Sequence, residues 1–293
     1  MIMTPHVTLT YTNSAGQSMG FNYFSSYICN RSEGIVPNQV HLSKQPGVHG
    51  HRTTGMSLDS RQKTLGGEVR QGISLAVAER TLHTIFNPTL GGVLRYQHSQ
   101  EGADTWISCK LNEFPQVYWR QGRLRFDIDL VCPDPFWKGQ SVREIIAVTR
   151  KMFTFPMKIP KKGVVFGLRR ATLESTFENK GNVEGDFIAT IRARNGTVTN
   201  PEIITALTGE RVRILYTMRP DDVITIISSL QERTVLLNGA NALHLLDVDV
   251  SQFFRIAVGT NVIRYSADEN VSNIFMHVDY IPNYTFALGG GIA

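Results

Sequence analysis

Hydrophobic and polar residues alternate with a period of two along most of the chain. In the first half this pattern holds in VTLTY (7–11), GEVRQGISLAV (67–77), VLRY (93–96), TWISCKL (105–111), QVYW (116–119) and RLRFDIDLV (123–131). Such alternation places one set of side chains in a core and the other toward water or a neighbour. The runs are rich in Val, Ile and aromatic residues, and Gly, Pro or Asn separate them, which predicts a mostly β protein.

One stretch departs from this period and predicts a short helix. In LAVAERTLHTIFNP the apolar residues Val77, Leu82, Ile85 and Phe86 recur at near-helical spacing. The residue before a proline avoids the helical region of backbone conformation, so the dipeptide NP that closes the stretch ends the pattern. We expect a helix over about 77–86 that packs on a sheet.

Residues 30–66 are polar and Gly-rich, and they hold three of the eight histidines. Structureless loops of this length are uncommon inside a compact domain. Two interpretations stay open, an extended hairpin arm and a loop that contacts a partner. Because no cluster of carboxylates or cysteines accompanies His41, His49 and His51, we expect no metal site here.

The run RLRFDIDLV separates an apolar face from a charged face. Its charged positions are Arg123, Arg125, Asp127 and Asp129, which lie on one side of a strand. One hypothesis is that this face meets a neighbouring subunit or lines a channel. The other interpretation is a solvated sheet face.

This strand runs into a stiff, aromatic stop with the sequence CPDPFW. Pro133 and Pro135 cannot donate to a sheet ladder, so pairing should end there, and Asp134 between them suits a turn. Phe136 and Trp137 would be costly to expose, because each offers about 150–250 Å² for burial. They are candidates for a seam between two domains, or else they close the bottom of the first core.

Strand signals resume after residue 166. They recur in DFIATIRA (186–193), RVRILYTM, VITIISS, RTVLLNGANALHLLDV, SQFFRIAVGTNVIRYSA and SNIFMHVDYI, with turns rich in Asn, Gly or Asp. Short strands at regular spacing are typical of an all-β sandwich. We therefore expect two domains, over 1–140 and 166–293, joined by a linker over 141–165.

Composition and charge exclude several classes of function. No window of 18 or more apolar residues is present, so no membrane insertion is expected. The net charge of +5 is a mild excess, smaller than the usual footprint of a nucleic-acid binder. Cys29, Cys109 and Cys132 are odd in number and widely spaced, which predicts three reduced, buried thiols.

No enzyme is expected, because the sequence contains no readable set of nucleophile, base and orienting group. It has no GxSxG elbow and no phosphate-binding GxxxxGK[ST] loop. Asp127 and Asp129 could approach the separation of a glycosidase pair, but a single strand offers no cleft between them. We expect no catalytic site, no cofactor and no metal.

Phrases in both halves resemble the distal tail proteins of long-tailed bacteriophages and phage-tail-like particles. In the second half they are FENKGNVEGDFIATI, NPEIITAL, RPDDVITI, VLLNGANALHLLDV, FFRIAVGTNVIRY and IFMHVDYIPNY. In the first half they are GEVRQGISLAV, FNPTLGGVLRYQHSQ, TWISCKLNEFPQ and RFDIDLVCPDPFWKG. The strand that ends in Asp-Pro-Phe-Trp is the most specific of these phrases. Residues 30–66 depart from the resemblance.

The resemblance implies a structural role in a virion. The first domain would be a ring-forming β-sandwich with a short α-helix, and the second a galectin-like β-sandwich, or jelly roll. The protein would form a homo-hexameric ring at the virion tail tip after assembly in the host cytoplasm. That ring would join the tail tube protein to the tail-tip or baseplate protein. Its outer domains would dock adsorption proteins such as a receptor-binding protein, and DNA would only pass through the channel.

A carbohydrate-binding, lectin-like module for host recognition is the alternative function, in a phage tail or a phage-tail-like bacteriocin. Jelly rolls often bind sugars through an exposed aromatic platform. The second half has no Trp, and its candidate platforms are Tyr216, Tyr265, Tyr280 and Tyr284.

Overall fold

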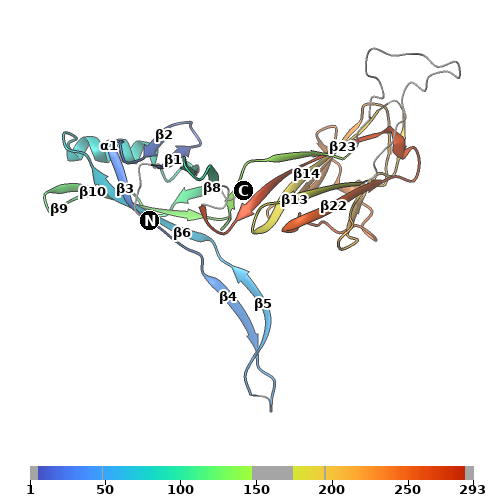
Figure 1. Cartoon of the computed structure of the whole chain (residues 1–293), viewed down its shortest axis with the longest axis horizontal. Helices are drawn as coiled ribbons and strands as arrows, with labels where there is room; N and C mark the ends of the chain where they lie inside the picture. The colour runs from blue at the N-terminus through green and yellow to red at the C-terminus, as the bar shows by residue number, and fades with distance from the viewer. Residues whose placement is uncertain (1–5, 48, 147–173, 195, 288–293) are drawn as a thin grey trace. The chain divides into compact units, whose positions relative to one another are not determined.

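The computed structural model describes residues 6–47, 49–146, 174–194 and 196–287 (Figure 1). The chain divides into two compact units, which we call unit 1 and unit 2. Unit 1 contains Met1–Gln140 together with Tyr284–Ala293, and unit 2 contains Ser141–Asn283. Of the linker expected over 141–165, residues 147–165 lie outside the described residues.

Unit 1 is built from two antiparallel ladders of strands. The first runs in the order β2 (Ser18–Phe21), β1 (Val7–Asn13), β7 (Gly92–His98), β8 (Ala103–Leu111) and β11 (Trp137–Lys138). The second runs in the order β9 (Gln116–Arg120), β10 (Arg123–Cys132), β6 (Arg61–Val69) and β3 (Tyr27–Ile35). The last residues of β8 also pair with β10, through Leu111 opposite Leu130, so the two ladders are continuous at one corner.

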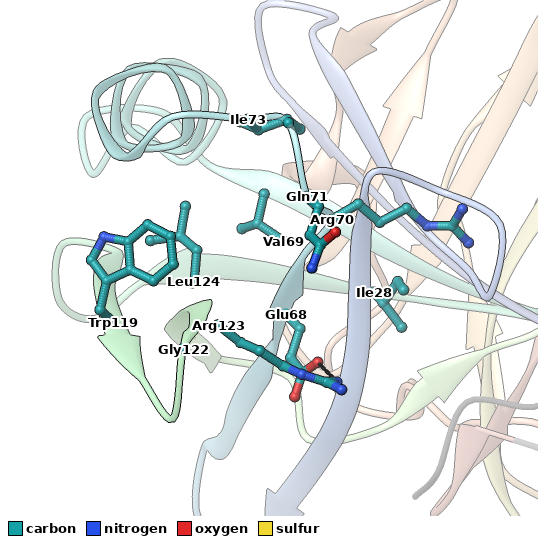
Figure 2. Close-up of a pocket in the computed structure, with 11 residues that line it drawn as sticks. Ile28, Glu68, Val69, Arg70, Gln71, Ile73, Trp119, Gly122, Arg123 and Leu124 are labelled. Carbon is teal, nitrogen blue, oxygen red and sulfur yellow. Dashed lines mark hydrogen bonds and ion pairs between the residues drawn. The ribbon is translucent and has the colours of Figure 1, made fainter.

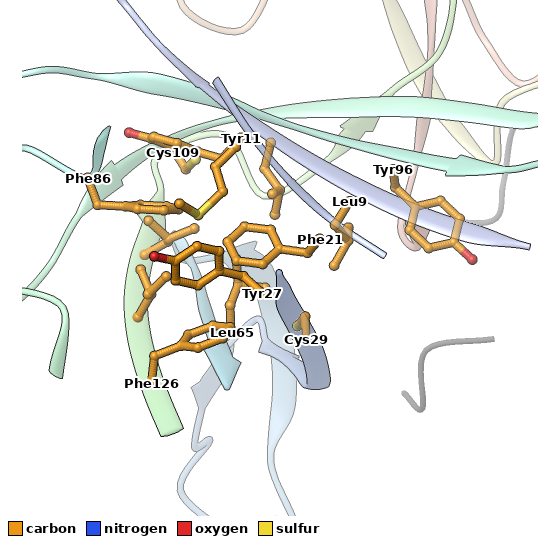
Figure 3. Packing of buried hydrophobic residues seen from close by; sticks show 14 of the residues in the cluster. Leu9, Tyr11, Phe21, Tyr27, Cys29, Leu65, Phe86, Tyr96, Cys109 and Phe126 are labelled. Carbon is orange, nitrogen blue, oxygen red and sulfur yellow. The ribbon is translucent and has the colours of Figure 1, made fainter. Parts of the chain in front are cut away.

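The core of unit 1 lies between the inward faces of these ladders (Figure 3). Aromatic side chains fill its centre. Tyr11 stacks on Phe86 with ring centroids 4.2 Å apart, and Phe21 meets Phe126 at 5.6 Å. Burying each such side chain is worth about 1.5–3 kcal/mol, so this cluster is a main source of the stability of unit 1.

The expected helix is confirmed as α1 (Leu75–Ile85), and it begins two residues earlier than the periodicity indicated. The hydroxyl of Ser74 caps it by accepting a hydrogen bond from the backbone N–H of Val77 at 3.4 Å. Ala78 and Leu82 are its buried residues. The expected strand over 67–77 is wrong beyond Val69, because Gly72 adopts a φ of 101° and the chain turns into the helix there.

Residues 30–66 contain a hairpin arm, one of the two interpretations of that stretch. β4 (Asn38–Ser43) pairs with β5 (Arg52–Leu58), and the arm extends the ladder that β3 forms with β6. Figure 1 shows the two strands of the arm side by side, away from the other strands of unit 1. All residues of β4 are exposed, and so is nearly all of β5.

Unit 2 contains two main antiparallel ladders around a second core. One contains β12 (Val142–Ile145), β23 (Ile274–Tyr284), β14 (Val183–Ala193), β19 (Val223–Ser228), β20 (Arg233–Leu237) and β21 (Ala240–Asn241). The other runs in the order β13 (Glu174–Asn179), β22 (Gly259–Ser266), β16 (Glu202–Thr205) and β17 (Arg211–Arg213). β15 (Val198–Thr199) and β18 (Thr217–Met218) form a short extra pair.

The prediction of a mostly β fold is confirmed, and the strand signals of the second half fail in one region. The phrase ALHLLDV forms the 3-10 helix η1 (Leu243–Leu245), and a second 3-10 helix, η2, spans Val271–Asn273. Between Leu246 and Val258 the chain has isolated bridges at Leu246 and Ile256 in place of the expected strand. Apolar residues of this loop, among them Phe254 and Ile256, pack into the second core. An alternating pattern of apolar residues cannot distinguish such a loop from a strand.

Candidate assembly surface

The charged face of β10 lies on the four-stranded ladder β9-β10-β6-β3. Along β10 the apolar residues are buried in alternation, as the sequence predicts. Arg123 is exposed, whereas Arg125, Asp127 and Asp129 are half-buried beside neighbouring strands. The structure therefore brings all four predicted residues onto one face, together with partners from β3, β6 and β9.

The two arginines of this face share one carboxylate. Glu68 of β6 lies opposite Arg125 in the strand register. Its two oxygens accept hydrogen bonds from Arg123 at 2.7 Å and from Arg125 at 3.2 Å. The hydrogen bond from Arg123 to this carboxylate raises the pKa of its guanidinium. Glu68 is remote in sequence, which is why the sequence pattern did not reveal it as the partner.

The two aspartates of the face are also paired within the chain. Asp127 accepts from Arg31 of β3 at 3.1 Å and from the Tyr118 hydroxyl of β9 at 2.8 Å. The bond to Asp127 raises the pKa of Tyr118. Asp129 accepts from the hydroxyl of Thr64. Exposed ion pairs of this kind contribute about 0–1 kcal/mol each, so the network orders the face more than it stabilises the fold.

Two glycines of β6 allow its neighbours β3 and β10 to pack closely against it. A Cβ atom at Gly66 would lie 2.6 Å from the Asp127 carboxylate. A Cβ atom at Gly67 would lie 2.1 Å from the Ile28 carbonyl oxygen and 2.6 Å from the Phe126 ring. The pair Gly-Gly inside a strand signals close approach of backbones, and the sequence reading did not use that signal.

A hollow of about 410 Å³ opens at the end of the same ladder (Figure 2). β9 and β10 meet there in a two-residue turn, in which Gln121 and Gly122 both have positive φ. Trp119 of β9, 61% exposed, lies beside Leu124, and the Glu68–Arg123 pair lines the other part of the hollow. No pattern in the sequence signals this hollow, because it depends on where β6 and β10 separate.

The aromatic stop has the turn that the sequence predicts. β10 ends at Cys132, directly before Pro133, and the Asp134 carboxylate accepts from the backbone N–H of Phe136 at 3.1 Å. Trp137 is buried in the core of unit 1, where it meets Tyr96 edge-on. Phe136 is half-buried. The placement of Trp137 fits the interpretation that the stop closes the first core, and the seam between domains stays a prediction.

The hairpin arm is amphipathic across its two faces. Val40 lies opposite Met56, and Asn38 lies opposite Leu58, so Val40, Met56 and Leu58 share a face. Met56 is 70% exposed on this face. Gln39 and Ser57 pair on the other face. The arm thus presents apolar side chains that the described part of the chain leaves uncovered.

The tyrosines considered as sugar platforms are mostly core residues. Tyr265, Tyr280 and Tyr284 are buried, and the Tyr216 hydroxyl donates to Asp222 at 3.2 Å. Phe177 stacks on Tyr280 at 5.1 Å, which withdraws that ring from solvent. No observation on these residues favours the lectin-like alternative.

Within 6–47, 49–146, 174–194 and 196–287, no group of three or more His, Cys, Asp or Glu is placed to hold a metal ion. In the same ranges no helix has the length and apolar character needed to cross a membrane.

Comparisons with known proteins connect this architecture to phage tails. Residues 180–284 match the family described as the siphovirus-type tail component, C-terminal domain (SPP1_Dit). The fold is similar to the crystal structure of SPP1 Dit (gp 19.1), described as a paradigm of the hub adsorption apparatus in Gram-positive infecting phages. That similarity has a TM-score of 0.64 and 13% identity, over 94% of this chain and 98% of that chain.

A second solved structure has the same fold. It is the phage P2 baseplate in its activated conformation with Ca, one chain of which gives a TM-score of 0.51 at 12% identity, over 96% of this chain and 99% of that chain. The search of curated proteins gave no match.

Residues 180–284 thus match a tail-component family, and the mostly β fold of the chain is similar to that of solved tail-hub and baseplate proteins. This match and the shared fold confirm the resemblance to distal tail proteins, the tail-tip or baseplate hubs.

Proposed function

We propose that this chain assembles head-to-tail into a hexameric ring at the virion tail tip, where it joins the tail tube to the tip or baseplate. The amphipathic arm is the observation that carries the proposal. A two-stranded hairpin alone is marginally stable in water, and this one exposes Val40 and Met56 on one face. A second copy of the chain that covers this face would supply the missing apolar contact.

A ring follows from such a contact because the arm and the surface that receives it are different parts of the chain. Contacts of this heterologous kind close into a ring when the rotation between subunits divides a full turn. The charged face of β10 would then lie against a neighbour or along the channel. Its arginines pair with Glu68, Asp127 pairs with Arg31, and Asp129 accepts a hydrogen bond from Thr64. DNA in transit would therefore meet few unpaired cations.

The two units divide the proposed task. Unit 1 would form the ring and contact the tail tube and tip proteins. Unit 2, with its galectin-like sandwich, would dock adsorption proteins such as a receptor-binding protein. The family match lies within residues 180–284 of this second part, which supports its assignment to a tail component.

Light scattering coupled to size-exclusion chromatography tests the ring directly, followed by negative-stain microscopy of the purified full chain. We expect the mass of a hexamer and ring-shaped particles with a central hole. A monomer at every concentration, both alone and with tail tube protein added, would contradict the proposal.

A further inference from the structure

Cys109 of β8 and Cys132 of β10 occupy facing positions on neighbouring antiparallel strands. The register between these strands pairs Leu111 with Leu130 and Lys110 with Val131. One step further along the same register, Cys109 stands opposite Cys132. Both side chains point into the core of unit 1 and are buried.

The pattern of backbone hydrogen bonds fixes the type of this pair. The N–H of Asn112 donates to the carbonyl of Asp129 at 2.9 Å, so these two residues form a hydrogen-bonded pair. Bonded and non-bonded pairs alternate along an antiparallel ladder, which makes Cys109 and Cys132 a non-bonded pair. In such pairs the Cα atoms lie about 4.5 Å apart, within the range of about 4.4–6.8 Å that disulfides need.

We propose that Cys109 and Cys132 are an oxidative modification site, at which a peroxide converts the two thiols into an intrachain disulfide. The oxidant class follows from burial, since a molecule as small as hydrogen peroxide can reach thiols that a bulky disulfide reagent cannot. The inference concerns unit 1 alone and does not rest on the proposed function.

The surroundings assign different roles to the two sulfurs. A hydrogen bond from Cys109 lowers the pKa of Cys132, and the nearby Lys63 and Arg61 lower it further against the effect of burial. The same bond raises the pKa of Cys109, and burial adds to this effect. Of the two sulfurs, Cys132 is therefore the one that loses its proton more readily, and the thiolate is the nucleophilic form of a cysteine.

The chemistry balances in two steps. The Cys132 thiolate attacks one oxygen of hydrogen peroxide, which breaks the O–O bond and gives a sulfenic acid with loss of hydroxide. The Cys109 sulfur then attacks the Cys132 sulfur, which forms the S–S bond and releases the sulfenic oxygen as water. In total two thiols lose two electrons and two protons, and one peroxide is reduced to two waters.

Cys29 supplies a matched control within the same core. It is buried as well, and burial raises the pKa of its thiol to about 11. Its thiol donates to the Arg31 carbonyl at 3.2 Å, and its strand β3 pairs with β6 rather than with β8 or β10. We expect Cys29 to stay reduced under the same treatment.

Mass spectrometry of the full chain tests the proposal. The protein is treated with hydrogen peroxide, unfolded, and alkylated with N-ethylmaleimide. We expect a mass loss of about 2 Da before alkylation, one alkylated residue in place of three, and a cross-linked peptide that joins Cys109 to Cys132. Dithiothreitol should restore all three thiols, and the cross-linked form should melt several degrees higher.

Two variants complete the test. Cys29→Ala should still form the cross-link and leave no alkylated residue, whereas Cys132→Ser should form none. Three alkylated residues in the peroxide-treated wild type would overturn the proposal, as would a cross-link through Cys29 or oxidation to sulfinic acid without a cross-link. The wild-type measurement stands by itself if a variant fails to fold.

Discussion

At the scale of single residues, Gly67 is the glycine of unit 1 at which an added side chain would meet its nearest neighbour at the shortest distance. A methyl group there would meet the backbone carbonyl of Ile28 at 2.1 Å, and a backbone atom cannot rotate away. We expect Gly67→Ala to lower the free energy of unfolding by about 3 kcal/mol. Urea denaturation measures this change.

Gly20 provides the matched control, because it also lies in a strand and a Cβ atom there would meet nothing within 4 Å. Gly20→Ala should be neutral or slightly stabilising. If both variants had the same midpoint urea concentration of unfolding as the wild type, β3 could not pack on β6 as closely as described.

Tyr11 gives the second residue-scale prediction, a loss of stability at alkaline pH. Burial raises the pKa of its phenol from 10.0 to about 12 in the folded protein. Between these two values the unfolded chain releases its proton first, so the free energy of unfolding falls as pH rises. The loss attributable to Tyr11 is on the order of 2 kcal/mol across this window.

The variant Tyr11→Phe isolates this effect. Its ring keeps the stack on Phe86, and the hydroxyl that it removes has no hydrogen-bond partner among the described residues. We expect unchanged or slightly higher stability at neutral pH and a shallower decline above pH 10, measured by urea unfolding at several pH values. Part of the decline should remain, since burial also raises the pKa of Tyr96 and Tyr284. An identical alkaline slope in the variant would refute the assignment.

At the scale of elements, the arm carries the prediction about assembly. Val40→Thr combined with Met56→Gln keeps side-chain size but makes the uncovered face polar. We expect each proposed subunit contact to weaken by about 1–2 kcal/mol, which would shift the proposed ring toward monomers in light scattering. The melting temperature of the monomer should not change, because both side chains are exposed.

The opposite face of the arm supplies the control. Gln39→Thr combined with Ser57→Thr changes two paired residues of the same strands and leaves Val40 and Met56 intact. This variant should assemble like the wild type. Equal loss of assembly in both double variants would show that the arm's fold, rather than its apolar face, was damaged.

Alternation of apolar and polar residues predicts some strands of this fold and fails for others. RLRFDIDLV predicted both faces of β10, because a strand that is buried on one side leaves a period of two. The same alternation gave a wrong strand prediction in GEVRQGISLAV (67–77). Only its first three residues belong to β6, and the chain turns at Gly72. Alternation within one strand also does not predict which residues of other strands its side chains contact. Glu68 contacts Arg123, and Arg31 contacts Asp127, because the fold brings distant strands together.

At the scale of the whole molecule, unit 1 depends on the segment that follows unit 2. Tyr284 is buried in the first core, the Arg61 guanidinium donates to the Thr285 carbonyl at 2.7 Å, and the Thr105 hydroxyl donates to the Ala287 carbonyl. A fragment of residues 1–140 lacks all of these contacts. We expect it to be less stable than unit 1 in the full chain by about 3 kcal/mol.

A chain in which a flexible Gly-Ser linker joins Gln140 directly to Tyr284 should recover this loss. Thermal unfolding of the two fragments, followed by near-ultraviolet circular dichroism, measures the difference. Equal melting temperatures would mean that residues 284–287 do not belong to the fold of unit 1.

The discontinuity of unit 1 also sets an order of events during synthesis. The ribosome makes Arg61 and Thr105 early, whereas the carbonyl groups that they bind, at Thr285 and Ala287, emerge only after all of unit 2. Domains generally fold as units while translation proceeds, so unit 2 can finish before the earlier part of the chain does. Unit 1 therefore completes these contacts only when nearly the whole chain has been made.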